Sequence, residues 1–175
     1  MLKQSKLIAI LLSLILTISL TGCMPVYETE NNDNPVTPTL YGPYSVERVV
    51  DGDTIIIDLD GERTRVRFLG VDTPESVAPD EERNTEEGVV ASDYTKTLLP
   101  KGSLVYLEYD IVRTDKYDRV LAYVYLDDQE TMIERKLLTD GMAKVYNDRD
   151  NKLYYDEFCK LEQAAQNSHI GIWAE

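Results

Sequence analysis

The side chains that could do chemistry are charged groups near the ends of short apolar segments. One such segment ends around Arg67 and is followed closely by Asp72 and Glu75. Asp53 follows an Asp-Gly pair upstream, and Arg119 ends a charged turn downstream. Carboxylate oxygens are the ligands that hard divalent cations prefer, and guanidinium groups can pair with two phosphoryl oxygens at once. This set predicts metal-assisted hydrolysis of a phosphodiester, because attack by water builds negative charge that cations must neutralise.

Each of these residues also has an ordinary structural explanation. Asp53 could bond the backbone of its own turn, as turn aspartates do. Arg67 is the last of three arginines at alternate positions, which could be the solvent face of a strand. Arg119 could balance Asp115 or Asp118, and Glu75 could be an exposed carboxylate on a helix or loop. A second aspartate beside a strand end favours the metal-binding hypothesis for the pair.

Five strands and three helices are predicted to position these side chains. Segments rich in β-branched and aromatic residues are separated by Asp-Gly turns, the pattern of an antiparallel meander. The predicted strands are 44–50, 54–59, 64–69, 104–109 and 120–126, and the predicted helices are 87–99, 131–140 and 153–166. The second helix is expected to begin at Thr131, because Thr131 and Glu134 have the spacing of a capping box. These elements predict an α+β fold, a five-stranded OB-fold barrel packed against three helices.

The N-terminal residues are predicted to be a targeting segment. Lys3 and Lys6 precede an apolar run that ends in Leu20-Thr21-Gly22-Cys23, which is the layout of a secretory signal. The run is shorter than the ~20 residues that a membrane span needs. Its last four residues resemble the lipobox of bacterial lipoproteins, which implies cleavage before Cys23 and a lipid on that cysteine. We expect a signal peptide at 1–22, a flexible tether at 23–43 and a folded domain at 44–175, anchored at the extracytoplasmic face of the cell membrane.

The folded part resembles the staphylococcal nuclease family over roughly residues 44–173. The matching segments are Asp51-Gly52-Asp53-Thr54, Arg67 to Glu75, Arg113 to Arg119 with the strand that follows, Gly141 to Val145, and Gly171-Ile172-Trp173. Their order and spacing together are hard to obtain by chance. The resemblance implies a Ca²⁺-dependent nuclease that cleaves single-stranded or denatured DNA and RNA with little sequence preference. We expect it to be a monomer.

The resemblance also implies a metal site and a catalytic carboxylate. Asp53 and Asp72 match the family's calcium-binding aspartates, and Thr73 matches the residue that offers its backbone carbonyl to the ion. Glu75 matches the glutamate that acts as general base for the attacking water or orients it. A general base of this kind contributes about 10²–10⁴ in rate.

The remaining matches are residues that contact the substrate. Arg67 and Arg119 match the two arginines that hold the scissile phosphate. Lys116 and Tyr117 match residues that contact the terminal phosphate and the nucleotide, and an aromatic ring there could stack on a base without sequence preference. Tyr146 is assigned to the same group across a gap of one residue.

Charge is the main departure from this pattern. The family carries a lysine-rich loop between the positions of Glu75 and Gly88, where this chain has several acidic residues. Removal of residues 1–22 takes away two lysines and leaves 16 basic and 32 acidic residues, a net charge of −16. Non-specific binding to nucleic acid is mostly electrostatic, so we expect weak, salt-sensitive capture of substrate by basic residues near the site.

The same acidic charge supports two rival hypotheses. One is a non-catalytic OB-fold module that binds a ligand or a surface. The other is a structural lipoprotein of the cell envelope whose metal site only stabilises the fold. Every reacting position holds the required residue type, which favours the nuclease over both.

Overall fold

The computed structural model describes residues 37–77 and 80–174. The strands are β1 (Tyr41–Asp51), β2 (Thr54–Leu59), β3 (Glu62–Phe68), β4 (Val71–Asp72), β5 (Leu104–Glu108), β6 (Val120–Leu126) and β7 (Lys144–Val145). The helices are α2 (Glu86–Leu98), α3 (Ile133–Thr139) and α4 (Tyr155–Asn167), with short 3-10 helices η1 (Glu81–Arg83) and η2 (Gly171–Trp173). The predicted signal peptide, Cys23 and most of the predicted tether lie outside the described residues.

The main sheet is a closed barrel with the strand order β1-β2-β3-β6-β5. Its neighbouring strands are antiparallel except β3 and β6, which are parallel. The predicted five-stranded OB-fold barrel is therefore confirmed, and each predicted strand is present. Two short strands that were not predicted, β4 and β7, pair with each other outside the barrel.

Every second side chain of β2 points into the barrel and fills its interior. Ile55 and Ile57 are fully buried and belong to the core, whereas Ile56 between them faces the outside of the barrel. The Asp60–Gly61 turn that follows has positive φ at both residues, 55° and 90°, as a tight hairpin turn requires. This turn fixes the register of β2 against β3, and so the positions of the charged side chains on β3.

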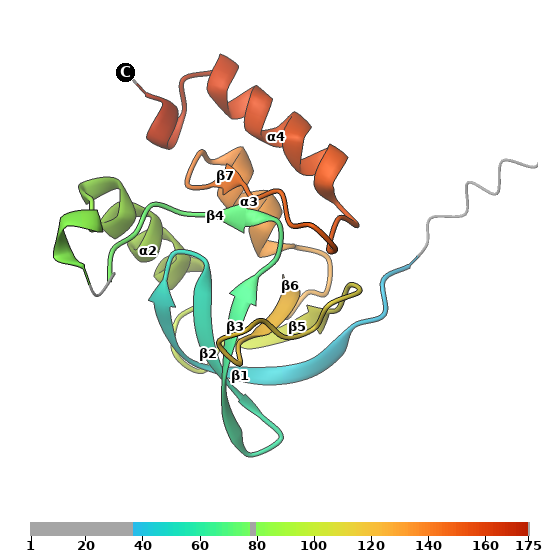
Figure 1. Cartoon of the computed structure of the whole chain (residues 1–175). Coiled ribbons are helices and arrows are strands. Elements are labelled where there is room, and N and C mark those ends of the chain that lie inside the picture. The colour runs from blue at the N-terminus through green and yellow to red at the C-terminus, as the bar shows by residue number, and fades with distance from the viewer. Residues whose placement is uncertain (1–36, 78–79, 175) are drawn as a thin grey trace, which may run out of the picture. The chain divides into compact units, whose positions relative to one another are not determined.

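Helices cover one end and one side of the barrel (Figure 1). Helix α3 packs on β6, α4 packs on α3, and α2 packs on β1. Leu137, Leu138 and Phe158 of these helices are fully buried and join the barrel core. Helix α2 begins after Thr85, whose side-chain oxygen accepts a hydrogen bond from Gly88 N at 3.0 Å.

The predicted capping box at Thr131 is wrong. Helix α3 begins at Ile133, and its first turn has no side-chain cap. The Thr131 hydroxyl instead donates to Asp128 at 2.6 Å, while Glu134 is fully buried and accepts hydrogen bonds from Val124 N at 3.1 and 3.2 Å. Glu134 therefore ties α3 to β6 and does not cap its own helix.

Strand β1 begins at Tyr41, inside the segment predicted as tether. Tyr41 pairs with Leu107 of β5, so this end of β1 is part of the barrel. Among the residues that the structure describes, none of the helices has the length and apolar character needed to cross a membrane.

Candidate active site

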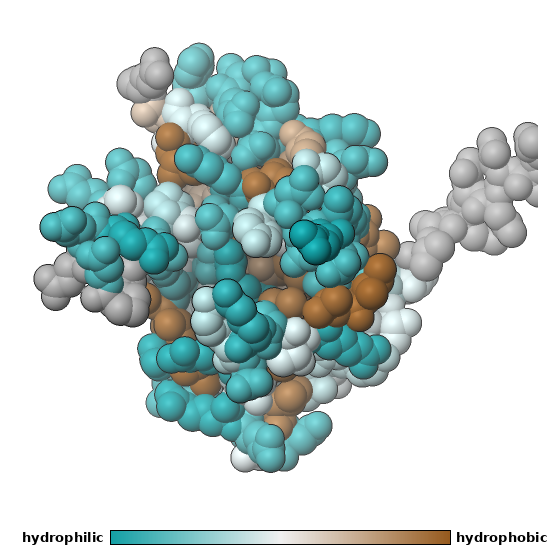
Figure 2. Space-filling model, in the orientation of Figure 1, coloured by the Kyte–Doolittle hydropathy of each residue, from teal (hydrophilic) through white to brown (hydrophobic). Residues whose placement is uncertain are grey.

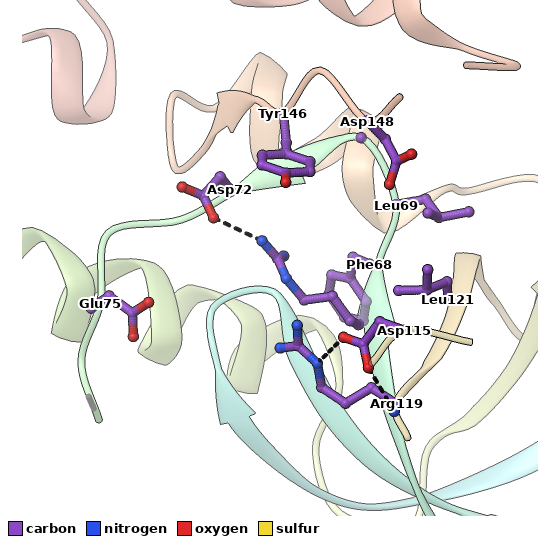
Figure 3. Close-up of a pocket in the computed structure, with 11 residues that line it drawn as sticks. Phe68, Leu69, Asp72, Glu75, Asp115, Arg119, Leu121, Tyr146 and Asp148 are labelled. Atoms are coloured by element: carbon purple, nitrogen blue, oxygen red, sulfur yellow. Dashed lines mark hydrogen bonds and ion pairs between the residues drawn. The ribbon is translucent and has the colours of Figure 1, made fainter. Parts of the chain in front are cut away.

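Arg67 lies at the centre of the site. It lies between the core residues Val66 and Phe68 on β3, so its side chain projects outward from the barrel. Arg67 Nη1 lies 2.7 Å from Asp53 Oδ2, and Nη2 lies 2.7 Å from Asp72 Oδ1. Figure 3 marks the second contact with a dashed line from Asp72. Two carboxylates from separate turns therefore meet on one guanidinium group.

One terminal nitrogen of Arg67 is buried and forms an ion pair without a well-aligned hydrogen bond. Its side chain is only 13% exposed, and Nη1 is a buried atom. The contact of Nη1 with Asp53 is close enough for an ion pair, but its N–H makes no hydrogen bond of good geometry to any described residue. A buried N–H without a well-aligned acceptor favours an incoming oxygen atom, such as a phosphoryl oxygen of a bound phosphate.

Asp53 is held rigidly by the turn between β1 and β2. Its Oδ1 accepts from the Thr54 hydroxyl at 3.0 Å. Its Oδ2 accepts from both the backbone N and the hydroxyl of Thr73, at 3.0 and 3.1 Å. Asp53 therefore bonds the Thr54 side chain and not the backbone of its own turn, and it ties that turn to the loop that carries the other carboxylates.

Glu75 lies in the loop between β4 and α2. Its carbonyl oxygen accepts from Thr85 N at 2.9 Å, and the adjacent Ser76 hydroxyl donates to Asp51 Oδ1 at 2.6 Å. Burial and then the negative charge of Asp51 raise the pKa of the Glu75 carboxyl, against the opposing charge of Arg83, whose Nη2 lies 3.2 Å from Glu75 Oε1. A carboxylate with a raised pKa is a stronger proton acceptor, which suits a general base.

Arg119 is positioned by Asp115 on the other side of the site, as Figure 3 shows. Arg119 Nε donates to Asp115 Oδ2 at 2.7 Å, and Arg119 N donates to Asp115 Oδ1 at 3.0 Å. Burial alone would raise the pKa of Asp115, but these hydrogen bonds and one from Tyr117 N lower it below its ordinary value. Asp115 is therefore a stable anion that fixes the direction of the Arg119 side chain.

The three predicted substrate-binding residues lie at different distances from this centre. Tyr146 lines the cavity beside Arg67 and is 52% exposed, and its backbone N donates to Gly70 O at 3.0 Å. Lys116 and Tyr117 line neither cavity of the site; the Tyr117 ring lies 5.6 Å from the guanidinium carbon of Arg119 and is 66% exposed. They form a rim beside Arg119.

Two adjoining cavities bring the predicted residues together. One has a volume of about 310 Å³ and the other about 330 Å³. Both are lined by Arg67, Asp72, Glu75 and Arg119, and Asp53 lines the second. The predicted metal-binding aspartates, general base and phosphate-binding arginines thus share one pocket, with a hydrophilic wall and space for a small anionic group.

The carboxylates fit a hard divalent cation held by few protein ligands. Burial raises the pKa of Asp72 and the negative charge of Asp53 raises it further, although Arg67 opposes both. Both carboxylates contact the same guanidinium group, so they are placed to share a cation. In the described part of the chain no group of three or more acidic, His or Cys side chains forms a metal cage. Asp53 and Asp72 are therefore the side chains that would hold the ion, with water and backbone oxygen completing its shell.

Two residues of the site were missed by the sequence reasoning. Asp51 accepts hydrogen bonds from Ser76 and Gly52 N, and its charge acts on Glu75. Asp115 was considered only as an alternative partner that would make Arg119 structural, whereas it aims Arg119 at the cavity it lines. A second acidic residue within each charged turn is the only signal that the sequence offers for either role.

Comparison with known proteins shows the family of the chain. Residues 65–175 match the family model described as staphylococcal nuclease homologue. The chain is 40% identical to a thermonuclease of Staphylococcus intermedius over 91% of this chain and 95% of that protein. It is 42% identical to a thermonuclease of Staphylococcus hyicus over 75% of each chain. It is 39% identical to the endonuclease YncB of Bacillus subtilis over 75% of this chain and 61% of that protein. The chain therefore belongs to the staphylococcal nuclease family, as its sequence pattern predicts, and it is a metal-dependent nuclease.

Proposed function

We propose that this nuclease is Ca²⁺-dependent, cleaves DNA and RNA with little sequence preference, and works as a lipid-anchored monomer on the extracytoplasmic side of the membrane. The observation that carries the catalytic part is the shared pocket, in which Arg67, Arg119, Glu75 and Asp72 line both cavities. Binding through arginines that contact phosphate also supports low sequence preference, because phosphate and sugar are common to every nucleotide.

The chain's own residues account for binding and for proton transfer. Arg67 and Arg119 bind the scissile phosphate from two sides, and each is held in place by an acidic partner. Glu75 removes a proton from the water that attacks phosphorus, so that the water attacks as hydroxide in line with the leaving oxygen. The two guanidinium groups stabilise the negative charge that develops on the phosphoryl oxygens.

Calcium, when bound by Asp53 and Asp72, would add a further positive charge beside the phosphoryl oxygens and the attacking water. Oxygen donors and an irregular, partly exposed arrangement suit Ca²⁺ better than Mg²⁺, which demands near-octahedral geometry. Asp72 fits such a ligand because its side chain is 58% exposed and can turn toward solvent.

The catalytic proposal is tested by substitution of the base. The full chain in detergent is incubated with single-stranded DNA, with Ca²⁺ or with chelator, and product is measured by gel. Glu75→Gln should lower kcat by about 10²–10⁴, whereas Glu87→Gln on the exposed side of α2 should leave it unchanged. Equal activity of both variants, or cleavage that survives chelation, would contradict the proposal.

The anchoring proposal rests on the Leu-Thr-Gly-Cys sequence and is tested separately. In a bacterial host that processes lipoproteins, Cys23→Ser should move the protein from the membrane fraction to a soluble fraction, with its specific activity unchanged. Incorporation of labelled fatty acid should be lost with it. Retention of Cys23→Ser in the membrane with its label would overturn the anchor.

A further inference from the structure

We propose that Arg48 of β1 and Arg63 and Arg65 of β3, on the outer face of the barrel, bind the phosphodiester backbone of the substrate next to the scissile phosphate. We call these three residues the arginine row. The proposal rests on the proposed function and deepens it, since it assigns residues that hold a strand longer than the group in the active site. None of the three lies in the short matching segments named in the sequence analysis, and only Arg65 falls within the residues that match the family model.

Strand register places the arginine row on one face. Arg48 pairs with Ile56 across β1 and β2, and Ile56 pairs with Arg65 across β2 and β3. Directly opposed residues of antiparallel neighbours point to the same side of the sheet. Along β3 the arginines recur at every second position up to Arg67, at intervals of about 6.6–6.8 Å. This interval is comparable to the separation of successive phosphates in an extended nucleic-acid strand.

Ile56 is the apolar residue that lies between Arg48 and Arg65 of the arginine row. It is only 3% exposed although it lies outside the barrel core. Its two cross-strand neighbours are Arg48 and Arg65, and all three line the same cavity. Arginine commonly buries its aliphatic stem on an apolar surface and leaves the charged head in water. Stems packed on Ile56 in this way would restrict the two guanidinium groups, which would lower the entropy lost when they bind a phosphate.

The row continues directly into the active site. Arg48, Arg63, Arg65, Ile56, Thr64 and Asp118 line a cavity of about 330 Å³. Arg65 also lines the active-site cavity that contains Arg67 and Arg119. A strand whose scissile phosphate lies on those two arginines would thus reach the row with its next phosphates.

Charge complementarity identifies the occupant. The chain carries a formal net charge of −14, yet three arginines gather on this face. Arg48 and Arg65 are exposed and make no ion pair with any other described residue, while Arg63 pairs with Glu47 at 2.5 Å. Figure 2 shows the surface over the lower barrel, where Figure 1 draws the β2–β3 hairpin, as mostly hydrophilic. A basic groove on an OB-fold face that follows a backbone is the arrangement that binds single-stranded nucleic acid.

The test measures binding without cleavage. All proteins are full-length, carry Glu75→Gln, and are kept in chelator. The probe is a labelled single strand of about 12 nucleotides, followed by fluorescence anisotropy at several salt concentrations. Arg48→Gln with Arg65→Gln removes two charges from the row, and glutamine keeps part of each stem over Ile56. The matched control, Lys152→Gln with Lys160→Gln, removes two charges near α4.

The row variant should bind the long probe about tenfold more weakly than the control, with a salt slope smaller by about 1.4 for two lost phosphate contacts. For a nucleoside bisphosphate the two variants should differ by no more than about twofold, because only Arg65 of the row lines the cavity that holds this short probe. Equal affinity and slope for the long probe would overturn the inference, as would an equal loss for the short probe. A wild-type chain that cleaves nothing, together with the expected binding difference, would reject the proposed function and leave the row standing.

Discussion

Asp115 illustrates how a single side chain can decide whether an arginine is structural or functional. It accepts hydrogen bonds from the side chain and the backbone of Arg119 and from Tyr117 N, all within 3.0 Å. A surface ion pair of this kind adds little to stability, because solvent screens it. Its effect is on direction: Arg119 is left with its terminal nitrogens toward the cavity that it shares with Arg67.

Replacement of Asp115 by asparagine should therefore weaken catalysis more than it weakens the fold. Asparagine can keep one backbone contact but cannot hold the guanidinium by charge, so we expect kcat/KM to fall about tenfold. The midpoint of thermal unfolding should change by no more than a few degrees. Asp127→Asn, in the exposed turn after β6, is the control and should change neither. A large loss of stability with unchanged kinetics would show that Asp115 has only a structural role.

At the scale of elements, the N-terminus of α2 fixes the loop that carries Glu75, the proposed general base. A Cβ atom built on Gly88 would lie 2.1 Å from the carbonyl oxygen of Glu75, closer than any real contact. The first turn of the helix therefore lies directly against the backbone of Glu75, and Thr85 N donates to the same oxygen. Any side chain at position 88 must push the two segments apart.

Gly88→Ala should lower both stability and rate. Overpacking at a backbone contact costs about 1–3 kcal/mol, and displacement of Glu75 should reduce kcat by at least about tenfold. Gly61→Ala is the control, because its φ of 90° makes alanine unfavourable while its Cβ would meet no atom within 4 Å. That variant should be destabilised but should keep its kcat. If Gly88→Ala retains full kcat in the folded protein, the contact does not position the base.

Glu134 connects α3 to β6 and should make stability depend on pH. Burial raises the pKa of its carboxyl well above the ordinary value of 4.5, although Val124 N and other groups oppose this. Because its pKa is higher in the folded state, Glu134 contributes fully to the free energy of unfolding below pH 4.5. This contribution is lost as the pH rises through the pKa of the folded state. Glu134→Gln, which resembles the neutral acid, should gain stability relative to the natural chain as pH increases.

Chemical denaturation at several pH values measures this difference. The free energy of unfolding of Glu134→Gln minus that of the natural chain should be smallest near pH 4 and increase above about pH 4.5. Glu130→Gln, in the exposed turn before α3, should give a nearly constant difference. A constant difference for Glu134→Gln as well would mean that its pKa is not raised by folding.

The elements that the sequence predicted correctly are those whose signals are local. Five strands and three helices follow from apolar periodicity and turn residues, and their ends agree within about three residues with those observed. The capping role predicted for Glu134 was wrong because a polar residue near the start of a helix is typical of a cap. The actual partner of Glu134, the backbone N of Val124, lies on a neighbouring strand. The two-residue pairing of β4 with β7 is likewise too short to leave a periodic pattern. In the site, Arg67 and the carboxylates were predicted, but the bonds that Asp51 and Asp115 make depend on distances that only the folded chain sets.

At the scale of the whole molecule, residues from Thr37 onward form a compact unit with one hydrophobic core. The core cluster includes residues of the barrel and of the helices, such as Ile55, Leu137 and Phe158. Removal of one large side chain from such a core should affect the whole unit, because a single core unfolds cooperatively. The site lies on this unit alone, since every residue of its two cavities is within it.

A fragment of residues 37–175 should therefore fold and act without the segment before it. We expect one cooperative unfolding transition that coincides by circular dichroism and by tyrosine fluorescence. Its kcat/KM on soluble single-stranded DNA should be within about twofold of the full chain in detergent. Two separate transitions, or a fragment that folds but loses most activity, would show that the N-terminal segment contributes to the enzyme.

The bridging position of Arg67 has a consequence for how the ion and the substrate influence each other. In the folded chain the guanidinium contacts both Asp53 and Asp72 and offsets part of their negative charge, so the two carboxylates are held together without a metal ion. A phosphate that draws Arg67 toward itself exposes both carboxylates, and thereby strengthens their hold on a cation. By reciprocity a bound cation releases Arg67 for phosphate, so the two ligands should bind with positive cooperativity through one shared side chain.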